Sequence, residues 1–267
     1  MFPTKKLTTN EVITGELAQN GEWVVARLDP QIGWPTSVQK IVYRGHTIFL
    51  LPQFDDYYPS VVVRLGAPRL GTFEEAQILI LNLLSVLCWV ENRGALVDAW
   101  TGGNLPRPMA GYSRSGVRMI LSSGFKHHYL PDVSDKNARW ALAFYREGLS
   151  MRPTPYAFLS LYKIINMLHK KGPQQKAWIN ANVEAAARHD SKKRLQVLRQ
   201  SHSDVGHYLY ESGRCAIAHA GHGTTVDPEN PADMKRLADD FPLIRDLAAY
   251  AIEKEFGVKS LKHPLIL

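Results

Sequence analysis

SDVGHYLYESGRCAIAHA, residues Ser203 to Ala220, is the stretch around which the rest of the chain is organised. It contains an arginine and a histidine, Arg214 and His219, among polar residues at steps of three and four, and the glycine-rich GHG follows it. Such spacing predicts a helix with one polar stripe and one apolar side. The predicted stripe consists of Asp204, His207, Glu211 and Arg214, and the predicted apolar side of Val205, Leu209 and Ile217.

The spacing of Arg214 and His219 sets a geometrical condition. Four residues separate them, so on an α-helix the two differ by about 7.5 Å in rise and by roughly 140° in rotation. Only the long reach of an arginine side chain could bring the two groups together. Alone, the two residues make half of a site.

Length and charge narrow the class of protein. A chain of 267 residues is long enough for two domains that each bury a core. Its 32 Lys and Arg against 25 Asp and Glu give a net charge of +7, which favours a phosphate-bearing partner. A basic protein without any anionic partner is the alternative that composition leaves open. Cys88 and Cys215 are the only cysteines, too few for a disulfide framework or a Cys-ligated zinc site, and they predict reduced thiols in a cytosolic compartment.

We predict no membrane partner and a cytoplasmic location. The start of the chain, MFPTKKLTTNEV, lacks the apolar run of a signal peptide. The longest apolar run, Ile78 to Val90, is interrupted by Asn82 and Ser85, and it is shorter than the roughly 20 residues of a membrane span. We expect this run to form a core helix.

Residues 1–112 predict a strand-rich α+β domain. Four β-branched or aromatic runs, WVVARL, IVYR, TIFLL and SVVVRL, lie between Trp23 and Leu65 and are separated by glycines and prolines. This pattern predicts an open antiparallel sheet with a hairpin turn at Arg44-Gly45-His46. A long apolar helix should follow, capped by Thr72, ended by Gly94 and packed against the sheet.

The second half has the pattern of an α-helical up-and-down bundle. Glycines and prolines from Trp100 to Pro131 predict a loop, and we place the connection between the domains at 113–134 and the bundle at 135–267. The first expected helix is capped by Ser134 or Asp135 and ends before Pro153. A second follows at 156–171, where Gly172-Pro173 stops it, and a third at 176–188. A loop and a short helix are expected in 188–199, and one or two helices in 233–256.

Arg214 and His219 are the residue types that RNA cleavage requires. That reaction removes a proton from a ribose 2′-hydroxyl, protonates a leaving oxygen and stabilises extra charge on phosphorus. Histidine titrates near neutral pH, and a guanidinium binds phosphate in a fork. The structural alternative is that Arg214 pairs with Glu211 or Asp204 on a solvated surface, and that His219 ends a helix where its charge offsets the dipole.

The second half also resembles the HEPN family (higher eukaryotes and prokaryotes nucleotide-binding domains), whose mark is R-x-x-x-x-H late in a helical bundle. The matching residues are Arg214 to His219, RCAIAH, followed by Ala220, with the upstream segments WALAFYREGLSM and PYAFLSLYKIINMLHKK. The resemblance covers about Asp135 to Phe256. The layout of a strand-rich front and a helical back is similar to that of methylamine utilisation protein J-type proteins and of HEPN proteins in bacterial defence systems.

The resemblance implies a metal-independent endoribonuclease without a cofactor, in which two protomers bring their Arg–His pairs to one cleft. Arg214 would hold the scissile phosphate, and His219 would act as base or acid at the 2′-hydroxyl. The family's polar residue after the arginine is Cys215 here, and its acidic residue on an earlier helix falls at Asn166 or Tyr162. Glu211, one turn before Arg214, is the expected substitute.

Further basic residues predict a surface that follows an RNA backbone beside this cleft. They are Lys192, Lys193, Arg194, Arg199 and His222. His219 and His222 lack a third ligand nearby, so no metal site is expected. The predicted function is therefore a homodimeric ribonuclease that acts on single-stranded RNA or tRNA as a toxin or antiviral defence effector. The alternatives are a non-catalytic module that binds RNA or a nucleotide, and an accessory protein of methylamine-type metabolism.

Overall fold

The computed structural model describes residues 21–53, 57–66, 70–110, 130–151, 155–219 and 225–259. The chain divides into two compact units, Met1–Leu130 and Pro131–Leu267. The first contains an antiparallel sheet and the second is helical, so the predicted α+β fold class is confirmed. Most of the predicted connection at 113–134 lies outside the described residues.

Five antiparallel strands form the sheet of the first unit, in the order β2-β3-β4-β1-β5. Their bounds are β1 Trp23–Pro30, β2 Gln39–Tyr43, β3 His46–Leu51, β4 Ser60–Arg64 and β5 Ala95–Gly103. The predicted hairpin turn is confirmed, because Tyr43 pairs with His46 across Arg44 and Gly45. These two turn residues have φ of 52° and 80°, the left-handed conformation that a two-residue hairpin requires.

The fifth strand contradicts the loop that was predicted from Trp100 onwards. Trp100 to Gly103 complete β5, which pairs with β1 from Trp23 to Pro30. Gly102 is closely packed, because a Cβ on it would lie 3.1 Å from the Trp23 carbonyl oxygen and 3.2 Å from the Phe73 ring. Gly102, one of the glycines that indicated a loop, therefore lets a helix pack closely on a strand.

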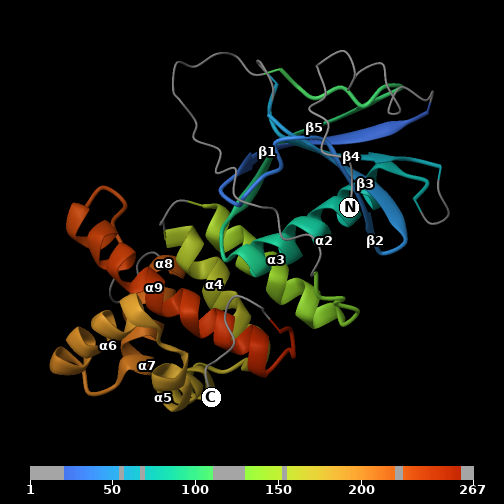
Figure 1. Cartoon of the computed structure of the whole chain (residues 1–267). Helices are drawn as coiled ribbons and strands as arrows, with labels where there is room; N and C mark the ends of the chain where they lie inside the picture. The colour runs from blue at the N-terminus through green and yellow to red at the C-terminus, as the bar shows by residue number, and fades with distance from the viewer. Residues whose placement is uncertain are drawn as a thin grey trace. The chain divides into compact units, whose positions relative to one another are not determined.

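Helix α2, Phe73–Glu91, covers one face of this sheet (Figure 1). Thr72 caps it as predicted, since its side chain accepts a bond from the Glu75 N–H and the Glu75 carboxylate accepts one in return. The helix ends at Asn92 in the left-handed conformation, and not at Gly94 as predicted. Its length and composition would suffice to cross a membrane, but most of its apolar window is buried, as in the core helix of a soluble protein.

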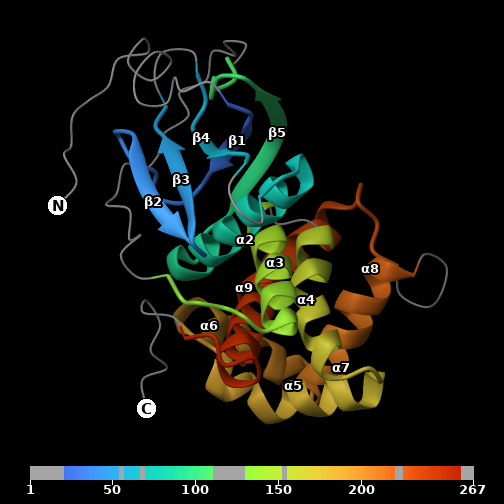
Figure 2. The ribbon, with the colours of Figure 1, turned by 90° about the vertical axis from the view of Figure 1, so that its right-hand side faces the viewer.

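Helix α4 packs against both α3 and α9 in the second unit (Figures 1 and 2). The longer helices are α3 Lys136–Ser150, α4 Pro155–Leu168, α5 Gly172–Ala186, α6 His189–Ser201 and α9 Pro231–Lys254. Asp135 caps α3 as predicted. Several boundaries differ from the prediction. Helix α4 ends at Leu168, three residues before the predicted end, and Gly172-Pro173 begins α5, because proline fits the first turn of a helix. Helix α6 is helical from His189 on, and α9 begins at Pro231.

Candidate functional site

The stretch that opened the sequence analysis forms three short helical pieces between α6 and α9. They are α7 Val205–Tyr208, the π-helical segment η2 Leu209–Cys215, and α8 Ala216–Ala218. The single α-helix predicted for this stretch is therefore wrong. In η2 the Ala216 N–H reaches back to the Glu211 carbonyl, five residues earlier, and such wide turns occur frequently at functional sites.

Asp204 fixes the start of these pieces. Its carboxylate accepts the backbone N–H of His207 at 2.6 Å and the side-chain amide of Asn180 at 2.8 Å. Asn180 in turn accepts the N–H of Gly206 at 2.7 Å. The Asn180 bond and then the His207 bond lower the pKa of Asp204 below its ordinary value of 3.8. The cap thereby ties α7 to α5.

Gly213 fixes the middle of η2 against α4. A Cβ at this position would lie 2.5 Å from Cζ of Phe158, so only glycine lets the wide turn approach that ring. Phe158 is fully buried, and its ring stacks on Tyr162 at 6.2 Å between centroids. The π-helical segment is thus seated on α4.

Arg214 and His219 meet on this segment. Arg214 Nη1 lies 3.0 Å from His219 Nε2. Because a guanidinium can only donate, Nε2 accepts this bond and the ring proton lies on Nδ1. The two groups meet because α8 ends at Ala218, where His219 leaves the helix with φ −126° and ψ 98°. His219 is exposed and Arg214 is half-buried.

Tyr210 backs this pair with an aromatic ring that two cations contact. Arg214 Cζ is 5.6 Å and Lys176 Nζ is 5.1 Å from the centre of the ring. Burial, followed by a hydrogen bond with Cys215, raises the pKa of the Tyr210 hydroxyl. The phenol therefore remains neutral and available for hydrogen bonding at physiological pH.

Lys176 connects the remaining polar residues of the stripe. Its ammonium lies 3.7 Å from the Glu211 carboxylate and 3.5 Å from Nδ1 of His207. Glu211 therefore pairs with Lys176, and Asp204 serves as a cap. The predicted alternative, an Arg214 pair with Glu211 or Asp204, is not the arrangement that the described contacts show; Arg214 contacts His219, Cys215 and Tyr210 instead.

Helix α4 contains two buried polar atoms. The hydroxyl of Tyr162 and Oδ1 of Asn166 have no hydrogen-bond partner among the described residues. The Tyr162 ring meets Tyr210 edge-on at 6.5 Å. Burial raises the pKa of Tyr162, which keeps it a neutral donor. These are the positions where an acidic residue was expected.

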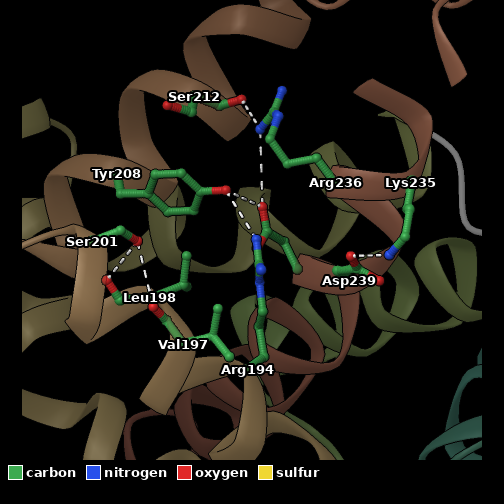
Figure 3. Close-up of polar contacts among 10 residues, drawn as sticks. Arg194, Val197, Leu198, Ser201, Tyr208, Ser212, Lys235, Arg236 and Asp239 are labelled. Carbon is green, nitrogen blue, oxygen red and sulfur yellow. Dashed lines mark hydrogen bonds and ion pairs between the residues drawn. The ribbon is translucent and has the colours of Figure 1, made fainter. Parts of the chain in front are cut away.

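The predicted RNA-binding residues separate into two groups. Lys192 and Lys193 are exposed on α6, whereas Arg194 and Arg199 are held in ion pairs with Asp240 at 2.7 Å and Glu184 at 2.6 Å. Figure 3 shows Arg194 next to Tyr208, and both side chains bind the buried Asp240. His222 lies outside the described residues.

Sequence reasoning missed Lys176 and Tyr210 as members of the cluster that contains Arg214 and His219. Lys176 is far away in the sequence, and only the packing of α5 against η2 brings it near. Tyr210 lies in the stretch from Ser203 to Ala220, but the sequence analysis assigned it no function. No group of three or more metal-ligating side chains occurs in the part of the chain that the structure describes.

Together, these features define a two-unit α+β protein whose helical unit presents a basic, tyrosine-backed Arg–His site on a π-helical turn. Residues 141–253 of this unit match the family model described as methylamine utilization protein MauJ. The match runs from within α3 into α9 and includes every residue of the site. No curated protein and no solved structure matches the chain.

Proposed function

We propose that this chain is an endoribonuclease of the HEPN type in which Arg214 and His219 act on the scissile phosphodiester without a metal ion. The observation that supports the proposal is the 3.0 Å contact between the guanidinium and the imidazole. It combines a phosphate-binding group with a general base on an exposed surface. Lys176 adds positive charge to the same surface, since it lies 5.1 Å from the ring that Arg214 also covers.

The Arg–His bond is the resting arrangement in this mechanism. An incoming phosphate takes over the guanidinium with two charge-assisted bonds, and this frees Nε2 of His219. Nε2 then accepts the proton of the ribose 2′-hydroxyl while that oxygen attacks phosphorus. The P–O5′ bond breaks, the leaving oxygen receives a proton, and the products are a 2′,3′-cyclic phosphate and a 5′-hydroxyl end.

A second copy of the chain supplies the proton for the leaving oxygen. A single histidine that has just accepted a proton on one side of phosphorus lies on the wrong side to protonate the opposite oxygen. In a homodimer the second His219 occupies that side. Each turnover then needs both His219 side chains, so an excess of His219→Ala chain mixed with the native chain should form heterodimers with a single histidine and suppress the native activity.

The direct test is cleavage of single-stranded RNA and tRNA in the presence of a chelator. We expect cyclic-phosphate ends from the native protein and a loss of about 100-fold or more in His219→Ala, the range that one acid–base group supplies. His189→Ala, which removes an exposed histidine at the start of α6, is the matched control and should retain full activity. RNA that stays intact at every pH near neutrality would contradict the proposal, and RNA binding without cleavage would favour a non-catalytic module.

The family match favours a second candidate function. Proteins of the matching family are described as methylamine utilization proteins, so an accessory role in the metabolism of methylamine-type compounds is the competing proposal. It predicts that Arg214→Ala and His219→Ala leave RNA unaffected but impair growth on methylamine in a host that carries the native protein. Normal growth of both variants would contradict it.

A further inference from the structure

The first unit contains a cavity that the Arg–His site does not use. Its volume is about 820 Å³, and its walls come from β1, β2, β3 and β4, so we call it the sheet cavity. A volume of this size lies within the range of small-molecule sites, roughly 300–1,000 Å³. Its lining residues are Gly21, Trp23, Lys40, Gly45, His46, Thr47, Phe49, Arg64, Leu65, Gly66 and Leu70.

Strand register places the sheet cavity on the face of the sheet that α2 does not cover. Val24 pairs with Gly102, and Gly102 packs under the Phe73 ring of α2. Successive residues of a strand point to opposite faces, so Trp23 belongs to the other face. Its neighbours there are Arg64, directly opposite on β4, and Phe49, whose ring centre is 5.9 Å away.

The walls of the sheet cavity combine aromatic rings with positive charge. Trp23 is almost fully buried and supports Phe49, which is only partly buried and presents its ring to the cavity. Lys40 lies directly opposite Phe49 on the next strand, so each aromatic residue is paired with a basic one. Among the described lining residues none carries a carboxylate.

The rim of the sheet cavity carries a charged side chain, the Arg64 guanidinium. At Gly21, a Cβ would lie 3.0 Å from Nη2 of Arg64 and would collide with the rest of that guanidinium. The glycine therefore lets the Arg64 side chain lie along the rim.

We propose that the sheet cavity binds a nucleoside phosphate, with the base against Phe49 and the phosphate between Lys40 and Arg64. Bases stack on aromatic rings, and guanidinium and ammonium groups bind phosphate. A free nucleotide and the terminal nucleotide of an RNA carry the same chemistry. The proposal is independent of the ribonuclease activity, because every residue of the sheet cavity belongs to the first unit.

Fluorescence anisotropy of a labelled nucleoside diphosphate, titrated with the full-length chain, tests the proposal. We expect saturable binding that weakens about tenfold in Lys40→Ala and in Arg64→Ala. Arg93→Ala removes an equal charge from an exposed position outside the sheet cavity and should bind normally. Phe49→Leu keeps the site apolar but removes the ring, and it should bind several-fold more weakly. Lys40 and Arg64 are exposed, so thermal melting should show native stability for both variants.

Competition distinguishes the two ligand sources. Unlabelled nucleoside diphosphate and a short 5′-phosphorylated RNA are compared on the His219→Ala chain, where cleavage does not interfere. Whichever of the two, the nucleoside diphosphate or the RNA, displaces the label more strongly is the natural ligand, and this result supports the site. The proposal is overturned if no saturable binding occurs, or if Arg64→Ala and Arg93→Ala bind equally well. Inorganic phosphate that competes as strongly as the nucleotide would overturn the stacking contribution of Phe49.

Discussion

At the residue scale, the site depends on how Tyr210 holds two cations close together. Lys176 and Arg214 both contact its ring, and their mutual repulsion is reduced because each interacts with the negative face of the aromatic system. Lys176 is also paired with Glu211. The cluster can therefore concentrate positive charge for a phosphate without placing two bare cations side by side.

Substituting Tyr210 separates the role of the ring from that of the hydroxyl. Tyr210→Leu should lower kcat/KM for RNA cleavage about two- to fivefold, because a cation–π contact at an exposed site contributes about 0.5–1 kcal/mol. Tyr210→Phe retains the ring and should keep near-native kcat/KM. A larger loss in Tyr210→Phe than in Tyr210→Leu would show that the hydroxyl matters more than the ring.

At the element scale, the π-helical segment is held by a cap at one end and a glycine in the middle. Asp204 caps α7 and binds Asn180 of α5, while Gly213 packs on Phe158 of α4. Both contacts act on backbone that carries Arg214. They fix the rotation of η2 about its axis, and therefore the direction in which the Arg214 side chain points.

The Asp204 cap should contribute stability that depends on pH. Asp204→Ala should lower the free energy of unfolding by about 1 kcal/mol at pH 7, the usual cost of a lost N-cap. The folded pKa of Asp204 is lowered from 3.8, so this contribution is present above pH 3.8 and is lost as pH falls through the folded pKa. Urea unfolding of the native and variant chains between pH 3 and 7 measures it. A difference that stays constant to the lowest pH would contradict the assignment.

Gly213→Ala should destabilise the helical unit by roughly 1–3 kcal/mol, because its new methyl group would overlap the Phe158 ring. Ser212→Ala, at the neighbouring position, serves as the control. Shortening the partner should reveal the cause: the double variant Gly213→Ala, Phe158→Leu should be less destabilised than the sum of the two single variants. Strict additivity in thermal melting would show that the two positions do not interact.

At the scale of the whole molecule, the buried Asp240 connects distant parts of the helical chain. Arg194 of α6 and Tyr208 of α7 bind it at 2.7 and 2.8 Å, and Arg236 of α9 lies 3.9 Å away. Arg236 also donates to the Ser212 carbonyl at 2.7 Å (Figure 3). One carboxylate thus joins α6, α7 and η2 to the last helix.

Removing one partner of this buried network should be costly. Asp240→Asn leaves Arg194 without its counter-charge and should lower the free energy of unfolding by about 3 kcal/mol. Lys193→Ala, at an exposed neighbouring position, should change it by less than about 0.5 kcal/mol. Chemical denaturation measures both. Equal changes in the free energy of unfolding for the two variants would show that the Arg194 ion pair is not required for stability. Arg194 would then again be a candidate RNA-binding residue.

The sequence predicted features that depend on local chemistry and missed those that depend on packing. The α+β class, the Thr72 and Asp135 caps and the Arg44–Gly45 turn follow from residue type and spacing, and all are confirmed. The strand at Trp100 was missed because Gly102 serves a helix elsewhere in the sequence. The contact of Arg214 with His219 required a wide turn and a chain that leaves the helix at His219.

The π-helical segment changes the direction in which all the residues after it point around the helix axis. A hydrogen bond that spans five residues, as from Ala216 to Glu211, stores one residue more than the same turn of an α-helix holds. Deleting that residue would leave a continuous helix with its propensity intact, but it would rotate everything beyond it by about 100°. Arg214 and His219 would keep their spacing in the sequence and lose their alignment with Tyr210 and Lys176. The extra residue of η2 therefore determines the direction in which the Arg214 and His219 side chains point.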